Sequence, residues 1–340
     1  MTAKYASRRR YAALAACLLL ALPSSSAVTQ AASVRGETVT LIVPNSAGGL
    51  MARYAHMIAP YIAKHAGAEE VRVRIMTGGG NIRGTNYLWY AEPDGRTIGF
   101  TSIPSLILAQ LSGSEAVRFD TTRLVYLGRA ATEARVLTVG VHSGIDSAEA
   151  LMNLDRPFVF PSQGTDEDFY SMVVLGHALG MELKLVMGYD GNADTAMAVI
   201  RGDGDGHITA WRASLGVIEA GDERPILTLG AERYPRYADV PTAMEVSNPE
   251  SRPAVQAIVN MLDMHRGFFG PPGLDPEATA ELRAAISAAL ADPELIAESE
   301  RQRMPLIPSD GETEQAKIAQ ITGAGAVIVP ILQAALERIR

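Results

Sequence analysis

The sequence predicts an α/β protein with parallel strands and two domains. A short apolar, β-branched run, residues 39–43, ends in a glycine turn and is followed by apolar residues at helical spacing. The same pattern recurs at residues 71–75. Four further short strands, which can form a second α/β sheet, are expected at residues 158–160, 183–187, 208–210 and 226–229. About 308 residues remain after an N-terminal targeting segment, which favours two domains over one.

Residues 1–32 are predicted to be a signal peptide. Lys4 and three arginines at 8–10 precede an apolar run at 11–22, and small residues follow it. The arginine cluster leaves Sec and twin-arginine export open. The single cysteine, Cys17, resembles a lipoprotein cleavage site, but the apolar run continues beyond it. We therefore expect a mature protein that is soluble in the periplasm.

The charge of the mature chain bears on its partners. Cleavage removes four basic residues and no acidic ones, which changes the formal net charge from −8 to about −12. Such an acidic protein is poorly suited to bind nucleic acid or anionic membranes. No second stretch reaches the ~18 apolar residues of a membrane span. We expect a monomer with no nucleic-acid partner.

Two glycine turns, residues 43–49 and 77–82, are the candidate binding elements. Glycine permits φ > 0 and a close approach of backbone N–H groups, and each following helix start offers unpaired donors. Ligands of open α/β sheets bind outside the carboxyl ends of the strands, where these donors lie. An anion is therefore the expected ligand. The spacing of Gly78, Gly80 and Gly84 departs from the dinucleotide fingerprint, and no cofactor is expected.

Three motifs in order carry a family resemblance. They are Val43-Pro44-x-x-x-Gly48-Gly49, Gly79-Gly80-Asn81-Ile82 and Ala91-x-Pro93-Asp94-Gly95-x-Thr97. Together they resemble the periplasmic solute receptors of tripartite tricarboxylate transporters, also called Bug receptors. Other family-like stretches continue as far as residues 267–273.

The resemblance implies a type II periplasmic-binding-protein-like fold, in which two α/β domains joined by hinge crossings close on a ligand in the cleft between them. Domain 1 would comprise residues 33–139 plus 264–340, and domain 2 residues 140–263. It also implies the function: a receptor that captures a small organic acid, usually a carboxylate, and delivers it to the membrane permease subunits of the transporter.

The resemblance implies the ligand-binding residues as well. In domain 1 the two glycine turns would bind largely through backbone groups, and in domain 2 the contacts would come from strand ends and turns. The full set is Ser46, Gly48, Gly49, Gly80, Asn81, Ser162, Gly164, Thr165, Tyr189 and Thr209.

Three carboxylates, Asp166, Glu167 and Asp168, stand where the family usually has small polar residues. Two interpretations are open. Either these residues stabilise a helix N-terminus, where acids are favoured, or one of them faces the cleft and selects a ligand that carries a cation besides its carboxylate. Other departures from the family pattern leave the ligand open: Ala47, Ala52 and Asp190.

No catalytic or metal-binding pattern is evident. The six histidines lack metal-ligand spacing, and Ser46 and Ser162 are not in a G-x-S-x-G elbow. We therefore expect neither a metal nor catalytic residues. An exported α/β hydrolase and a receptor that presents its ligand to a sensor kinase are the alternatives. Trp211 either packs in the core or stacks on an aromatic ligand.

Overall fold

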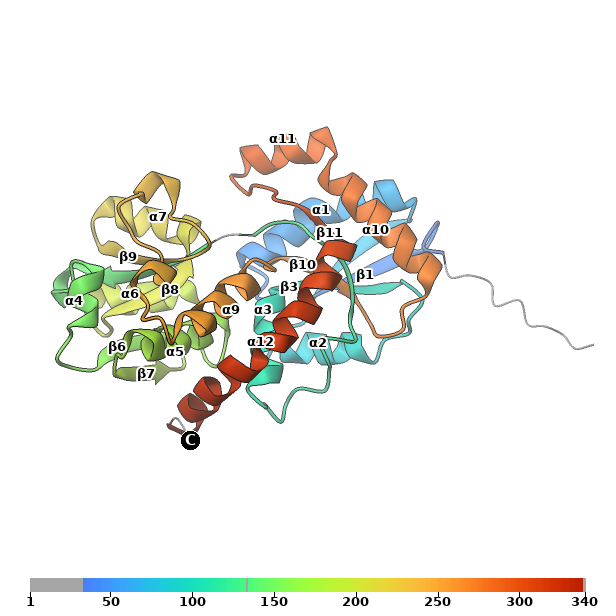
Figure 1. Ribbon diagram of the computed structural model, residues 1–340. Helices are drawn as coiled ribbons and strands as arrows, with labels where there is room; N and C mark the ends of the chain where they lie inside the picture. Colours follow the sequence, from blue (N-terminus) through green and yellow to red (C-terminus); the bar gives the residue numbers. More distant parts are fainter. Residues whose placement is uncertain (1–32, 133, 339–340) are drawn as a thin grey trace, which may run out of the picture. The chain divides into compact units, whose positions relative to one another are not determined.

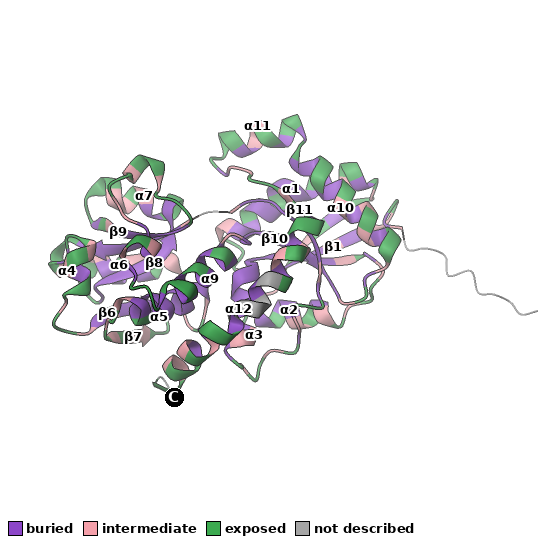
Figure 2. Ribbon diagram, in the orientation of Figure 1, coloured by how far each residue is buried: buried purple, intermediate pink, exposed green. Residues whose placement is uncertain are grey.

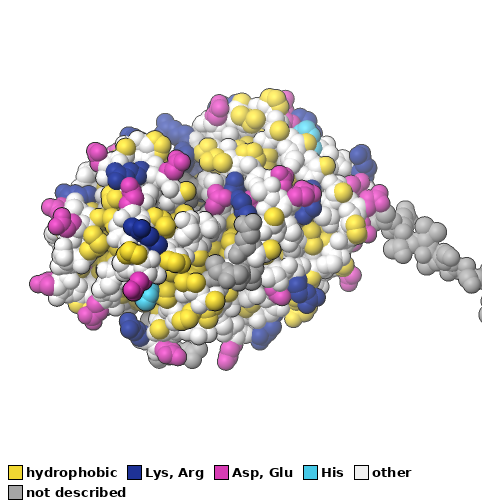
Figure 3. Space-filling view, in the orientation of Figure 1, with side chains coloured by type: hydrophobic (Ala, Val, Ile, Leu, Met, Phe, Trp, Pro, Cys, Tyr) yellow, Lys and Arg dark blue, Asp and Glu magenta, His cyan; other side chains and the backbone are white. Residues whose placement is uncertain are grey.

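The computed structural model describes residues 33–132 and 134–338 (Figure 1). The predicted signal peptide, with Cys17, lies outside these residues. In the described ranges no helix combines the length and the apolar character needed to cross a membrane. Basic and acidic side chains are interspersed on the face that Figure 3 shows.

The first sheet has six strands in the order β11-β4-β10-β3-β1-β2. β1 pairs in parallel with both β2 and β3, as expected for consecutive βα units, whereas β10 and β11 run antiparallel to their neighbours. The strands are β1 (Thr38–Val43), β2 (Glu70–Ile75), β3 (Thr97–Thr101), β4 (Val125–Arg129), β10 (Gly267–Gly270) and β11 (Ser309–Asp310).

Helices cover this sheet and bury a core of aliphatic and aromatic side chains. The rings of Phe100 and Phe268, on neighbouring strands, lie 4.4 Å apart at its centre. One helix, α12, contacts β4 and also packs against two helices from the middle of the chain, α5 (Glu167–Leu179) and α9 (Arg252–Leu262). The helices are α1 (Leu50–Ala66), α2 (Ile82–Trp89), α3 (Ile103–Leu111), α10 (Pro276–Leu290), α11 (Pro293–Arg301) and α12 (Gly311–Arg338).

The remaining strands form two small sheets. β5, β8 and β9 make an antiparallel sheet in the order β8-β5-β9, and β6 pairs in parallel with β7. The four short strands expected between residues 158 and 229 are thus present, but they are split between two sheets. Their bounds are β5 (Arg135–Gly140), β6 (Phe158–Ser162), β7 (Leu183–Met187), β8 (Gly206–Ala210) and β9 (Glu223–Leu229).

One helix of this part, α5, is buried over most of its surface (Figure 2). It packs against β8, α3, α9 and α12, so the first turn of α5 lies in the interior and not at the surface. The helices here are α4 (Ala148–Met152), α5 (Glu167–Leu179), α6 (Asn192–Arg201), α7 (Trp211–Ala220), α8 (Ala243–Val246) and α9 (Arg252–Leu262).

The expected domain boundary at residues 139/140 falls at the end of β5, which pairs with β8 and β9. Sheet membership alone does not define domains, so the domain limits stay a prediction.

Gly206 begins β8 where the backbone of β5 leaves no space for a side chain. A Cβ there would overlap Thr138 O and would lie 3.0 Å from the Phe158 ring. We expect Gly206→Ala to lower the free energy of unfolding by about 2–3 kcal/mol, because overpacking forces the backbone to shift. Urea denaturation measures this. Gly216→Ala in α7, where nothing lies within 4 Å, is the matched control and should be neutral or stabilising by about 1 kcal/mol. Equal stabilities of the two variants would contradict the expectation.

Candidate functional site

The two glycine turns meet at one edge of the first sheet. β1 and β2 end at Val43 and Ile75, which are register partners. Just beyond them, Asn45 Nδ2 donates to Asn81 Oδ1 at 3.0 Å, and Thr101 Oγ1, at the end of β3, donates to Asn45 Oδ1 at 2.8 Å. Asn45 therefore links three strand ends. The site residues predicted from the sequence omit Asn45, although it follows Pro44 inside the first motif.

The second turn has the left-handed backbone that its glycines predict. Gly78, Gly79 and Gly80 have φ of 135°, 61° and 61°, and Asn81, the N-cap of α2, has φ of 77°. The first turn differs, because Gly49 has φ of −76°. Its glycine is required for space instead: a Cβ at Gly49 would lie 2.9 Å from Ser46 Oγ. Positive φ therefore occurs in the second turn, and Gly49 does not adopt it.

The predicted residues after β6 and β7 are connected by hydrogen bonds. The buried Ser162 donates through Oγ to Gly164 O at 2.9 Å. Its backbone oxygen accepts from the N–H groups of Gly188 and Tyr189 at 3.1 and 3.3 Å. Ser162 therefore fixes the two loops against each other, and its hydroxyl is already used within the protein.

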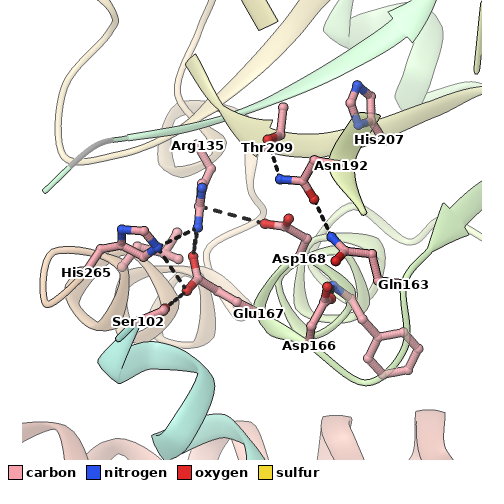
Figure 4. Close-up of polar contacts among 12 residues, drawn as sticks. Ser102, Arg135, Gln163, Asp166, Glu167, Asp168, Asn192, His207, Thr209 and His265 are labelled. Carbon is pink, nitrogen blue, oxygen red and sulfur yellow. Dashed lines mark hydrogen bonds and ion pairs between the residues drawn. The ribbon is translucent and has the colours of Figure 1, made fainter. Parts of the chain in front are cut away.

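Thr209, at the end of β8, lies in a chain of side-chain hydrogen bonds (Figure 4). Asn192 Nδ2 donates to Thr209 Oγ1 at 2.8 Å, and Gln163 Nε2 donates to Asn192 Oδ1. The sequence-based set omits Gln163 and Asn192. Their only signal is position, since each stands in a turn just before a predicted helix.

The β6–α5 loop approaches the second glycine turn. A Cβ built on Gly80 would lie 3.6 Å from Thr165 O, so these two predicted residues face each other across the site. Ser46, Gly48, Gly80 and Thr165 are exposed. As ligand contacts, all ten residues stay predictions.

The three carboxylates at the start of α5 have different roles. Asp166 is the N-cap, and its side chain accepts from Phe169 N–H at 2.9 Å, which matches the capping interpretation. Glu167 and Asp168 are buried and point into the interior of the site (Figure 4). The capping interpretation therefore accounts for Asp166 and not for its two neighbours.

Glu167 links several elements at the base of the site. Its Oε1 accepts from Arg135 Nε at 2.8 Å, and its Oε2 accepts from the hydroxyl of Ser102, the N-cap of α3. Arg135 also donates to His265 Nε2 at 3.1 Å. This nitrogen must be the acceptor, because a guanidinium has only donors. The four residues come from β5, α5, the start of α3 and the segment before β10, so sequence spacing gave no sign of the cluster.

The charges of this cluster do not balance. Burial lowers the pKa of His265 well below its usual range, and the neighbouring Arg135 charge adds to this, so the imidazole is neutral near pH 7. Burial raises the pKa of Asp166 to about 6 and that of Asp168 well above its usual range. Arg135 is the cation that acts on Asp166, Asp168 and His265, and Arg266 also acts on His265.

A hydroxyl, an imidazole and a carboxylate lie in the order of a catalytic triad nearby. His207 Nδ1 is 3.1 Å from Thr195 Oγ1, and His207 Nε2 is 3.1 Å from Glu223 Oε2. All three residues are buried, so a substrate could not reach the hydroxyl. Over the described ranges no group of three His, Cys, Asp or Glu residues could hold a metal ion.

Trp211 belongs to the core and not to the site. Its side chain is fully buried and stacks on Tyr234 and Tyr237, with ring centroids 4.5 and 5.3 Å away. The core alternative is therefore correct, and no ring face is left for a ligand.

A cavity of about 550 Å³ lies away from these residues. It is lined by Thr132 and Ala134, by residues 229–231, and by side chains of α9 and α12, and none of the ten predicted residues contributes to it. At the predicted site the two sides approach closely, as Gly80 and Thr165 illustrate.

Comparisons with known proteins agree with the resemblance. The family model described as the tripartite tricarboxylate transporter family receptor matches residues 56–328. A search of curated proteins finds no match.

Solved structures share the fold at low sequence identity. A TctC solute-binding protein from Polaromonas is 17% identical, with a TM-score of 0.67 over 88% of this chain and 98% of its own. MatC from Rhodopseudomonas palustris, solved with bound malate, is 18% identical, with a TM-score of 0.66 over 87% and 99%. R. palustris Rpa4515, solved with adipate, is 20% identical, with a TM-score of 0.65 over 86% and 97%. The expected periplasmic-binding-protein-like fold is confirmed. Because the family model spans most of the sequence, the protein belongs to the tripartite tricarboxylate transporter receptor family.

Proposed function

We propose that the protein is a periplasmic receptor that binds one small organic acid and delivers it to the permease subunits of a tripartite tricarboxylate transporter. The observation that carries this is the family match over residues 56–328. Relatives of the same fold that hold malate and adipate support a carboxylate as the ligand.

Two helix starts at the site are suited to an anion. The N-caps of α2 and α6 are Asn81 and Gly191, and neither makes a side-chain capping hydrogen bond. The partial positive charge at these two helix starts therefore favours a carboxylate. The start of α5 is different, because Asp166 caps it and two more acids follow. The ligand carboxylate is expected at α2 and α6.

Two chain crossings provide the hinge that closure requires. The first runs from β4 to β5 and the second from α9 to β10, and they are joined where Ala130 N–H donates to Arg266 O at 2.9 Å. Closure then depends on ligand contacts that are stronger in the closed state than in the open one.

The proposed receptor releases its ligand unchanged and works as a monomer in the periplasm. A thermal-shift screen of the purified protein against mono-, di- and tricarboxylates tests it. A ligand at 100 times its dissociation constant should stabilise the protein by ~2.7 kcal/mol, and mass spectrometry should recover it unaltered. Failure of every organic acid to stabilise the protein, or turnover of an ester, amide or phosphate, would count against the proposal.

A further inference from the structure

The start of α5 leaves one buried carboxylate without a full set of partners. Asp166 is used as the helix cap, and Glu167 bonds to Arg135 and Ser102. Asp168 is only 9% exposed, and its Oδ1 makes no hydrogen bond with any described residue. The nearest cation to this oxygen is Arg135 Nε, at 3.7 Å.

Arg135 cannot neutralise both acids well. Its Nε and Nη2 donate to Glu167 Oε1, and Nη2 also donates to the neutral His265. Its ion pair with Asp168 Oδ1, also drawn in Figure 4, is longer, at 3.7 Å. Oδ1 of Asp168 is left with one long ion pair and no hydrogen bond, which is unfavourable for a buried carboxylate oxygen. A donor that carries positive charge would satisfy both needs of Asp168.

The surroundings of Asp168 are polar and belong to the proposed ligand site. Its carboxylate lies between Arg135 and the chain formed by Gln163, Asn192 and Thr209 (Figure 4). Glu167, its neighbour on α5, contacts Ser102 on the opposite side of the site. A ligand bound here would therefore place one group next to Asp168 and its carboxylate at the starts of α2 and α6.

We infer that Asp168 recognises a positively charged group of the ligand, so that this receptor selects an acid that also carries an ammonium or similar cation over a di- or tricarboxylate. The inference rests on the proposed function and names its substrate class. A second carboxylate at this position would meet Asp168 and Glu167 at close range and be repelled.

Isothermal titration with four probes of equal chain length tests this: 5-aminopentanoate, glutarate, pentanoate and pentylamine, each repeated with shorter and longer homologues. The amino acid should bind about 10-fold or more tightly than the dicarboxylate of equal length. Asp168→Asn keeps the shape of the side chain and should weaken binding of the amino acid by about 10–100-fold, while the dicarboxylate should bind as before or more tightly.

Two controls separate charge recognition from folding. Asp146→Asn removes the same charge from an exposed position before α4, where no predicted site residue lies, and should leave the preference unchanged. Urea denaturation of each variant confirms that it is folded, and only folded variants are compared.

The outcomes distinguish the two proposals. Tighter binding of glutarate than of the amino acid, or equal weakening of all probes by Asp168→Asn, overturns the inference and leaves the receptor function standing. Binding of pentylamine without any acid overturns the proposed function and supports a cation site. Failure of every probe and homologue to bind overturns both.

Discussion

Replacing Arg135 with methionine is expected to lower the free energy of unfolding by about 3–5 kcal/mol, because the change leaves buried carboxylates without their cation. Arg135 is 7% exposed, Glu167 4% and Asp168 9%, so water cannot replace the lost partner. Methionine fills a similar volume, which limits the loss from packing. Urea denaturation at pH 7 measures the change.

A second substitution that removes the charge of a carboxylate identifies the cause of the lost stability. Adding Glu167→Gln to Arg135→Met should recover part of the stability, since the unpaired carboxylate is then gone, and a double-mutant cycle gives the coupling. The loss should also be smaller near pH 5 than at pH 7, because an unpaired buried carboxylate takes up a proton in the folded state first.

A surface pair provides the comparison. Arg233 contacts Glu245 at 2.9 Å, but both side chains are well exposed. Exposed ion pairs contribute little, so Arg233→Met should have a far smaller effect. Similar losses for the two arginine variants would mean that burial of the Arg135 cluster is not what makes it important.

The sequence predicts the parts of this protein whose causes are local. The strand–turn–helix units at residues 39–66 and 71–89 follow from apolar runs, glycines and helical spacing within a few residues of each other. The glycines of the second turn also indicate its left-handed backbone, which Gly78–Gly80 adopt. The first turn shows what a glycine pattern cannot predict. Gly49 has a negative φ, and a glycine is required there because a Cβ would clash with Ser46.

The contacts that define the site are distant in sequence. Glu167 bonds to Arg135 across 32 positions and to Ser102 across 65. Nothing in the composition of residues 166–168 separates the cap from the two buried acids, because all three have the same charge and lie in the first turn of one helix. Their roles depend on which face of α5 packs inward, and that is set by α3, α9 and α12.

Strand order is also beyond the sequence pattern. The runs at β6, β7, β8 and β9 were expected in one sheet, yet β8 and β9 flank β5 while β6 and β7 pair apart from them. Short apolar runs predict that strands exist but not which neighbour each one chooses, so that choice depends on packing between distant segments.

Gly80→Val should abolish ligand binding, a loss of about 100-fold or more, while the protein remains folded. Gly80 has φ of 61°, which a β-branched residue adopts only with strain, and it lies in the turn opposite Thr165. A side chain here would occupy the space between the two sides of the site and keep a ligand from the positively polarised start of α2. Isothermal titration with the tightest-binding acid of the screen measures the loss.

Gly49→Val tests the first turn by a different route. Its φ of −76° suits any residue, so the variant adds no backbone strain. Its side chain would instead displace Ser46, which a Cβ approaches to 2.9 Å at Oγ and 3.2 Å at the backbone O. Binding should again be lost, because the backbone of the turn can no longer approach the ligand.

Gly113→Val is the matched control for the strain in Gly80→Val. Gly113 has φ of 72°, lies beyond the end of α3 and has nothing within 4 Å of its Cβ position. It should cost about as much stability as Gly80→Val and leave affinity unchanged. Wild-type affinity in both the Gly80 and Gly49 variants would place the ligand away from the glycine turns, and the 550 Å³ cavity between α9 and α12 would then be the next site to test.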